Sequence, residues 1–263
     1  MTRHARSSWL GVAAAIALAT SIGTPGDGAR AESKGKKAEI PFDEASVFFE
    51  LNDTDGDLGI HALIDGDAWR SLGIDDTRGR PMLGVAVKGR LRQQGLTELF
   101  FESDEPSFDE LTPEEFFERF PAGEYEISGR TLDGEELEST VEVSQVMPAP
   151  PGNVQLSGVP AAESCDADPL PSIAPPVVIS WSTVGSSHPE IGEPGAIEVA
   201  KYQLVVEREE PELLVLSVDL PPGVTSFEVP EDFTDLGEAF KFEIVVRATN
   251  GNQTAIESCF ELE

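Results

Sequence analysis

Three aspartates alternate along a short polar segment, and their spacing is one that could bind a cation. Asp53, Asp55 and Asp57 are separated by single small residues, which would let three carboxylates converge on a hard ion such as calcium. The segment departs from an EF-hand loop, because Leu58 and Ile64 occupy positions where that loop needs glycine and glutamate. The same residues are also typical of a solvated turn between two strands. Calcium binding and a plain turn are therefore two open interpretations.

The residues that most catalytic mechanisms need are scarce. His61 and His188 are far apart in the sequence, and neither Cys165 nor Cys259 has a nearby histidine or lysine that would stabilise a thiolate. The sequence shows no nucleophile elbow, no glycine-rich phosphate loop and no Cys/His metal spacing. With 49 acidic residues, some carboxylate pair lies at glycosidase distance by chance alone. We predict that the protein is not an enzyme, with a secreted hydrolase carrying an accessory module as the alternative.

Charge is the strongest global feature of the chain. The 263 residues carry 49 acidic and 18 basic side chains, which gives a formal net charge of -31. Such a field repels nucleic-acid phosphates and anionic lipids, so neither is expected as a partner. The simplest role of the excess acid is solubility.

One concentration of basic residues interrupts this acidic background. Alternation predicts a strand over 83–91 that directs Lys88, Arg90 and Arg92 outward and Leu91 into the core. A row of cations on a solvated strand needs no function. It could also be a docking surface for the acidic second half of the chain or for an acidic partner.

The first residues predict export. Basic residues precede an apolar stretch over 9–20, and residues 29–31 have the small side chains that a signal peptidase recognises. We predict a signal peptide at 1–31 and a polar leader at 32–38. No later stretch reaches the ~20 apolar residues that a membrane helix needs. The mature protein is expected in a periplasm or outside the cell.

Alternating apolar residues predict a β-sandwich domain over residues 39–147. Seven segments have the pattern of strands: 46–51, 58–64, 68–74, 83–91, 96–102, 124–131 and 137–146. The first two are expected to form a hairpin around the three aspartates. One helix is predicted over 112–120, where Thr112 is a suitable cap and Pro113 suits the first helical position.

A second sandwich is predicted over residues 153–263, after a proline-rich linker at 148–152. Its central strand is 177–181, where every second residue is apolar. Three aromatic residues are expected in its core: Trp181, Tyr202 and Phe240. The whole chain would then be all-β, with two tandem antiparallel sandwiches of immunoglobulin-like type and one short helix in the first.

Four segments of the second half follow one another in an order that resembles the fibronectin type III family. They are a proline-flanked first strand, a tryptophan in the second strand, a tyrosine opening the third, and a sixth strand that ends in Ala-Thr-Asn-Gly: 148–156, 179–181, 202–206 and 240–251. The resemblance implies a spacer or interaction module. Phe240 stands where the family usually has the tyrosine of its tyrosine corner, so this position lacks the corner's hydroxyl.

The two cysteines follow the predicted cleavage site, and disulfides persist after export. Parity on the last strand directs Cys259 outward, so a bridge to Cys165 would pin the long insertion 160–176 over the outside of the sheet. Closing a loop of this length would stabilise the fold by about 4 kcal/mol in the chain-entropy model. Two free thiols or an intermolecular bridge are the alternatives.

These features predict an exported, non-catalytic binding or scaffold protein whose partner is another protein or a cell surface. Partner binding is expected at the end of the second sandwich that carries the loops 182–198 and 249–252. The alternative is a calcium-stabilised adhesion or carbohydrate-binding protein, for which Trp69 and the two tyrosines would be the available aromatic platforms.

Overall fold

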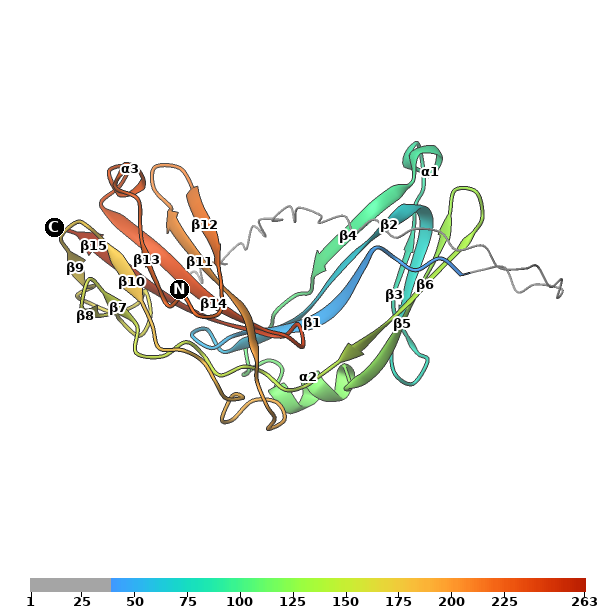
Figure 1. Cartoon of the computed structure of the whole chain (residues 1–263), viewed down its shortest axis with the longest axis horizontal. Coiled ribbons are helices and arrows are strands. Elements are labelled where there is room, and N and C mark those ends of the chain that lie inside the picture. Colours follow the sequence, from blue (N-terminus) through green and yellow to red (C-terminus); the bar gives the residue numbers. More distant parts are fainter. Residues whose placement is uncertain (1–38) are drawn as a thin grey trace, which may run out of the picture. The chain divides into compact units, whose positions relative to one another are not determined.

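The computed structural model describes residues 39–263 (Figure 1), so the predicted signal peptide and leader lie outside the described residues. The described chain belongs to one compact unit and has an all-β fold. It contains two hydrophobic cores, one formed mainly by residues 42–147 and the other by residues 156–260. The change from one core to the other falls at the predicted proline-rich segment 148–152.

The first half is organised around one long strand. Its strands are β1 (Glu44–Asn52), β2 (Asp57–Asp75), β3 (Pro81–Ala86), β4 (Leu96–Glu102), β5 (Gly123–Thr131) and β6 (Glu136–Val143). Its helices are α1 (Leu91–Gln94) and α2 (Pro113–Arg119). The first part of β2 pairs with β1 and β4, and its second part pairs with β3 and β5. β6 continues the sheet from β5.

β2 differs from the prediction of separate strands at 58–64 and 68–74. It is one strand of 19 residues whose pairing register shifts near its middle, so the strand bends there without ending. Gly66 lies at this shift and allows the close approach of Phe42, because a Cβ on Gly66 would lie 3.1 Å from the Phe42 ring. Residues 65–67, which separate the two predicted strands, are therefore part of one continuous strand.

The predicted strand 83–91 is also wrong in its second part. β3 ends at Ala86, and Gly89 adopts a left-handed φ of 65° that redirects the chain into the short helix α1. Leu91, predicted to face the core, is 53% exposed. The alternation of inward and outward side chains ends at Gly89, because the backbone is no longer extended there.

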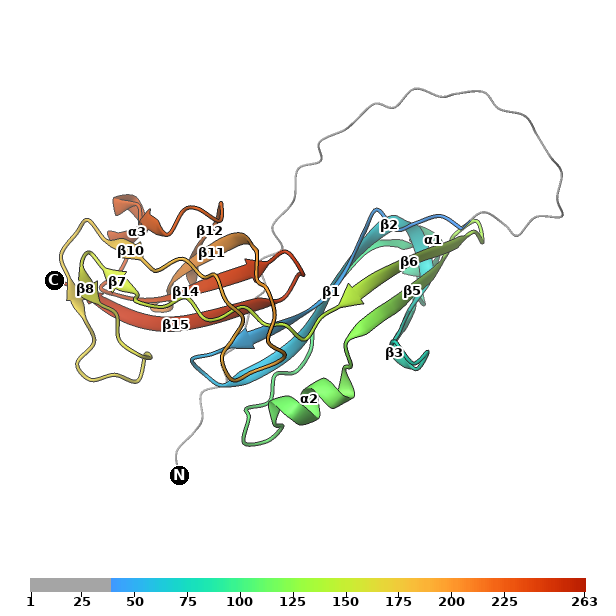
Figure 2. The ribbon, with the colours of Figure 1, turned by 60° about the horizontal axis from the view of Figure 1, so that its bottom comes forward.

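α2 confirms the predicted helix within one residue at each end. The Thr112 hydroxyl accepts a hydrogen bond from the backbone N–H of Glu115, and the Glu115 carboxylate accepts one from the N–H of Thr112, which completes a capping box. Phe116 is buried, and its ring packs edge-on against Phe49 of β1 with 5.5 Å between ring centroids. This contact holds the helix, visible in Figure 2 below β5, against the first core.

The second half is a sandwich of two sheets. Its strands are β7 (Gln155–Leu156), β8 (Val159–Pro160), β9 (Ser172–Ile173), β10 (Val178–Ser180), β11 (Val199–Arg208), β12 (Leu214–Leu220), β13 (Ser226–Glu228), β14 (Ala239–Ala248) and β15 (Gln253–Leu262). A short helix, α3 (Glu231–Thr234), precedes β14. One sheet has the order β13-β10-β7-β8, and the other contains β12-β11-β14-β15.

The three expected core aromatic residues lie in the second core. Trp181 is 5% exposed and packs edge-on against Tyr202 with 5.4 Å between ring centroids. The Tyr202 hydroxyl accepts a hydrogen bond from the backbone N–H of Val184 at 2.9 Å. Phe240 is buried and stacks on Phe260.

A tyrosine corner is found in the first half. Tyr125 lies near the start of β5, and its hydroxyl donates to the carbonyl of Pro121, four residues upstream, at 3.0 Å. This is the hydrogen bond that fixes the corner of many immunoglobulin-like sandwiches. The corner position that the family resemblance indicated, Phe240, has no hydroxyl to make it.

Cys165 and Cys259 form a disulfide, as predicted. The insertion that contains Cys165 also contributes β9, which pairs in parallel with the end of β15 and buries Ile173. Part of the insertion 160–176 therefore extends the sheet at its edge. This differs from the prediction that the whole insertion lies over the outer face of the sheet. The bridge and β9 together attach this segment to the last strand.

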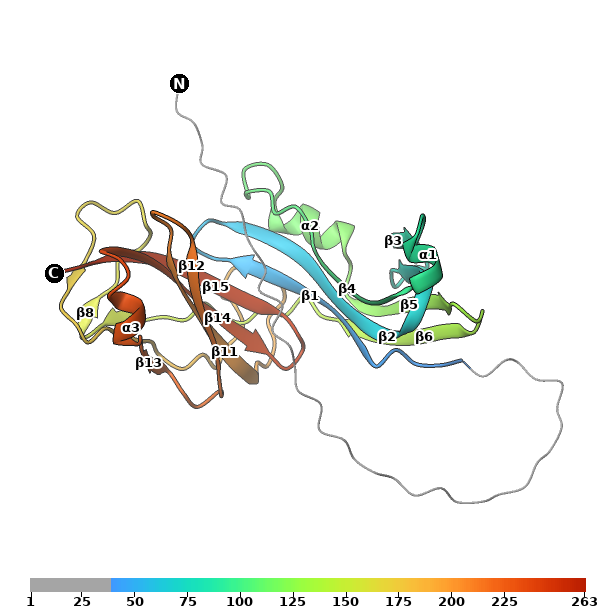
Figure 3. The same cartoon turned by 90° about the horizontal axis from the view of Figure 1, so that it is seen from above.

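The two halves share one sheet. β1 pairs in parallel with β15, so the strand order runs β12-β11-β14-β15-β1-β2-β5-β6 through both halves. Figure 3 shows β1 and β15 side by side. The proline-rich segment is fixed as well, because the carbonyl of Pro148 accepts a hydrogen bond from the hydroxyl of Thr254 at 2.7 Å. The two halves are thus joined by a continuous sheet and by side-chain hydrogen bonds as well as by the segment 148–152.

Candidate functional site

The end of the second sandwich at which we predicted partner binding contacts the first half of the same chain. In the loop 182–198, the backbone N–H of His188 donates to the carbonyl of Met147 at 2.8 Å. The Nε2 atom of His188 lies 2.9 Å from Oδ1 of Asp53, which belongs to the turn between β1 and β2. His188 therefore anchors this loop to the first half, while most residues of the loop remain exposed.

The turn between β14 and β15 makes the most concentrated set of these contacts. The side chain of Asn252 is 1% exposed, and its Oδ1 accepts from the backbone N–H of Phe49 at 2.9 Å. Its Nδ2 donates to the carbonyls of Ser144 at 2.7 Å and Val146 at 3.1 Å. One amide side chain thus links β15 to β1 and to the end of the first core. Without the Asn252 side chain, the N–H of Phe49 and the carbonyls of Ser144 and Val146 would each lose one hydrogen bond.

Strand pairing extends the contact along β15. Glu50 to Asn52 align with Gln253 to Ala255, and the backbone N–H of Asp53 donates to the carbonyl of Ala255 at 2.9 Å. We use the term joint for the contacts between 49–54 on the first half and 250–257 on the second.

Side chains at the far end of the joint continue the network. Asn52 Nδ2 donates to Oε1 of Glu257 at 3.0 Å, and the hydroxyl of Thr54 accepts from the backbone N–H of Glu257 at 2.9 Å. Glu257 also forms an ion pair with Lys241 of β14, with 2.6 Å between Oε2 and Nζ. Such fully connected polar networks specify one geometry, because each buried group has a partner only in that arrangement.

Acidic residues crowd one face of this sheet. Glu243 of β14 is directly opposite Glu257 of β15 in the pairing register. Burial raises the pKa of Glu243 well above its usual range, and the charges of Glu50 and Glu257 raise it further. Burial also raises the pKa of Glu50, whose carboxylate accepts a hydrogen bond from Gln253. Protonation of part of this cluster is therefore favoured in the folded protein.

A second acidic group lies at the start of β2. Burial, with the neighbouring charge of Glu105 next in size, raises the pKa of Asp57 to about 7. Burial and then the charge of Asp104 raise the pKa of Glu105 to about 7. His61 Nε2 lies 3.0 Å from Oε1 of Glu105. Asp57 pairs with Asn52 of β1, so this group lies beside the joint.

The structure gives the three aspartates separate roles. Asp53 contacts His188, Asp55 accepts a long hydrogen bond of 3.5 Å from Asn52, and Asp57 has a buried Oδ1 atom without a hydrogen-bond partner. Within residues 39–263, no group of three or more histidine, cysteine or acidic residues is arranged to hold a metal ion. Calcium binding at this turn therefore stays a prediction without geometric support, and a calorimetric titration with calcium would test it.

The aromatic residues considered for carbohydrate binding are core residues. Trp69 is fully buried, as are Tyr125 and Tyr202. A sugar platform requires an exposed ring face, so none of the three can serve as one without unfolding the core that contains it.

The predicted basic row is exposed. Lys88, Arg90 and Arg92 lie in the turn and short helix after β3, and all three are exposed. In the described part of the chain, none of them forms an ion pair with an acidic residue of the second half. The two halves contact each other through the joint and not through these three residues. If the basic row is a docking surface, its partner is therefore another molecule.

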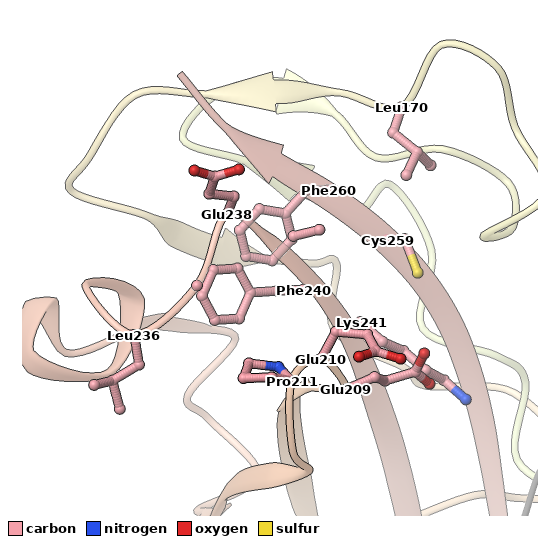
Figure 4. Close-up of a pocket in the computed structure, with 12 residues that line it drawn as sticks. Leu170, Glu209, Glu210, Pro211, Leu236, Glu238, Phe240, Lys241, Cys259 and Phe260 are labelled. Carbon is pink, nitrogen blue, oxygen red and sulfur yellow. The ribbon is translucent and has the colours of Figure 1, made fainter.

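A cavity of about 500 Å³ opens in the second half beside the disulfide. Its floor includes Phe240 and Phe260, and Leu236 and Pro211 form apolar walls (Figure 4). Three exposed carboxylates belong to its lining: Glu209, Glu210 and Glu238. The cavity can accept an apolar side chain that is accompanied by positive charge.

Sequence reasoning missed the joint, although one signal was present. The run Val47-Phe48-Phe49-Glu50-Leu51 has apolar residues on both parities, and Phe48 is buried although it points away from the first core. A strand that is apolar on both faces is usually covered on both. In the structure the guanidinium of Arg247, on β14, lies 4.7 Å from the centroid of the Phe48 ring.

Comparisons with known proteins give no family. No protein-family model and no curated protein matches the sequence. Among solved structures, similar chains include one from a study of host cell surface retention of a 1.5-MDa bacterial ice-binding adhesin (10% identity, 86% of this chain and 66% of that chain covered, TM-score 0.24). Another is a tetra-tandem repeat in the extending region of a large adhesion protein (11%, 84% and 50%, 0.27). A third is the human OSCAR ligand-binding domain (10%, 80% and 95%, 0.25).

This chain spans two thirds or less of the two adhesion-protein chains. At such identities and TM-scores the similarity carries no argument about this chain. Among residues 39–263, no helix has the length and apolar character required to cross a membrane.

Proposed function

We propose that this protein is an exported, non-catalytic binding protein in which two β-sandwich modules act as one rigid frame. The observation that carries the proposal is the joint, because it fixes the geometry of the modules through a shared sheet and the buried side chain of Asn252. A frame of this kind holds binding surfaces on different modules at constant separation, which reduces the entropy lost when both engage a partner.

Several features support this function. The disulfide suits an oxidising compartment and agrees with the predicted export signal. The β13-β10-β7 and β12-β11-β14-β15 sheets agree with the resemblance of the second module to fibronectin type III domains. The raised pKa values lie around the joint, where they bear on stability.

The test uses residues 32–263 as immobilised bait against the envelope and culture medium of the source organism. We expect a specific protein or surface component to be retained. The matched control is the Asn252→Ala variant, which keeps both modules but weakens the joint, and it is expected to retain less. The same protein is assayed against panels of esters and glycosides. Turnover that follows the protein through purification, or the same capture by bait and control, would overturn the proposal.

A further inference from the structure

The two most exposed large apolar side chains of the described residues lie in oppositely charged surroundings. Leu91 is 53% exposed, and its sequence neighbours are Arg90 and Arg92. Leu236 is 48% exposed and lines the cavity that carries the carboxylates of Glu209, Glu210 and Glu238. We use the term basic tip for residues 88–92 and acidic pocket for the cavity lined by Leu236 and these three glutamates.

The basic tip is built to project. Gly89 has a left-handed φ of 65°, and a Cβ placed on it would meet nothing within 4 Å. Lys88 and the two arginines are exposed, and within residues 39–263 none of them has an acidic partner. The basic tip thus gathers three cations within five residues of a chain whose formal net charge is -31.

The acidic pocket has the complementary character. Its volume of about 500 Å³ lies within the range of pockets that bind ligands. Phe240 and Phe260 line the cavity, and Figure 4 shows Leu236 and Pro211 on one side of the two rings. Lys241 is the one basic residue in its lining, and it is already paired with Glu257.

We propose that the basic tip of one molecule docks into the acidic pocket of a second copy. Leu91 enters the cavity and packs against Leu236, while Arg90 and Arg92 reach the rim glutamates. Both surfaces belong to this chain, both carry an exposed leucine, and their charges are opposite in sign, which argues for a second copy over an unrelated partner. Within a single molecule the pocket is lined only by residues of the second half, and Leu91 stays exposed.

Such a contact is heterologous, since two different surfaces meet. Each docked molecule leaves one free tip and one free pocket, so association can continue beyond a dimer. The contact is small, and interfaces below about 1,000 Å² are weak. It must also overcome repulsion between two strongly acidic molecules. A salt concentration of about 0.15 M shortens the screening length to about 8 Å, which suppresses that repulsion more than it weakens direct ion pairs.

Sedimentation velocity at about 0.15 M salt and protein concentrations up to about 1 mM tests the proposal. The native protein is expected to show reversible, concentration-dependent species larger than a dimer. Leu91→Asp and Leu236→Asp are each expected to remain monomeric at every concentration. An equimolar mixture of these two variants retains one working tip and one working pocket per pair, so it is expected to form dimers and nothing larger.

Charge-reversal variants provide a second test of the same contact by sedimentation velocity. Arg90→Glu with Arg92→Glu is expected to abolish association, and mixing this variant with Glu209→Lys and Glu210→Lys is expected to restore it. Val159→Asp, at an exposed apolar residue outside both surfaces, is the control and is expected to associate like the native protein. A native protein that stays monomeric throughout, or association that survives both Leu91→Asp and Leu236→Asp, would overturn the proposal. Neither outcome depends on which external partner the protein binds.

Discussion

Asn252 shows how a single side chain can connect two modules. It is buried and satisfies the backbone N–H of Phe49 together with the carbonyls of Ser144 and Val146. In the sequence it stands in an Asn-Gly-Asn turn, which is typical of any hairpin. The turn was predictable, but its partner was not, because the contact joins residues more than 100 positions apart.

Replacing Asn252 by alanine tests this role. The change removes the side-chain partner of the N–H of Phe49 and of the carbonyl of Ser144, whereas the carbonyl of Val146 keeps its hydrogen bond from Asn250. We therefore expect the free energy of unfolding to fall by about 2 to 3 kcal/mol. Urea denaturation measures the loss. Thr249→Ala, on the exposed side of the same turn, is the matched control and should change stability by less than about 0.5 kcal/mol. Equal effects of the two substitutions would remove Asn252 from its proposed role.

The acids near the joint predict how stability depends on pH. The pKa values of Asp57 and Glu105 are raised to about 7 in the folded protein, above those of unfolded carboxylates. At a pH between the unfolded and the folded pKa, the folded protein binds more protons than the unfolded chain. The stability that the two protonated carboxyl groups contribute is therefore complete below the unfolded pKa and is lost as pH rises through about 7. We expect the free energy of unfolding to be higher at pH 5 than at pH 8 in urea titrations.

The Glu105→Gln variant separates the pH dependence caused by the raised pKa of Glu105 from general repulsion among the acidic residues. Glutamine resembles the protonated carboxyl, so the variant is expected to be more stable than the native protein at pH 8, by on the order of 1 kcal/mol. The difference should disappear toward pH 5. Glu228→Gln, on an exposed position of β13, serves as the control. A native-like pH dependence in Glu105→Gln would contradict the assignment.

At the scale of elements, local pattern predicted most of the structure. The period of two located the strands, and the Thr-Pro-Glu-Glu signal located α2 and its capping box. Errors arose at Gly66, where one continuous strand was predicted as two, and at Gly89, where a turn was hidden in an alternating segment. The parallel pairing of β1 with β15 could not be predicted, because it depends on two strands that lie at opposite ends of the described chain.

The disulfide links the insertion to the last strand across 94 residues. Replacing both Cys165 and Cys259 by serine removes this constraint from the unfolded chain, and we expect stability to fall by about 3 to 4 kcal/mol. Calorimetry under non-reducing conditions measures the effect, and mass spectrometry of the unreduced native protein counts the thiols. Two alkylatable thiols in the native protein, or an unchanged melting temperature in the variant, would contradict the bridge.

At the scale of the whole molecule, charge opposes compactness. A net charge of -31 creates repulsion that salt screens, since the screening length falls from about 30 Å at 0.01 M to about 8 Å at 0.15 M. We therefore expect the melting temperature to rise over this range of sodium chloride. A fall would mean that attractive ion pairs, such as Lys241 with Glu257, outweigh the repulsion.

The central claim is that the joint makes one rigid body of two sandwich modules. Residual dipolar couplings of backbone amides measure this directly, because each module reports its own alignment tensor in a weakly aligned sample. We predict that couplings from the first core and from the second core fit one common tensor in magnitude and orientation. Two different tensors, with a reduced magnitude for one module, would show that the modules move independently and would contradict the account.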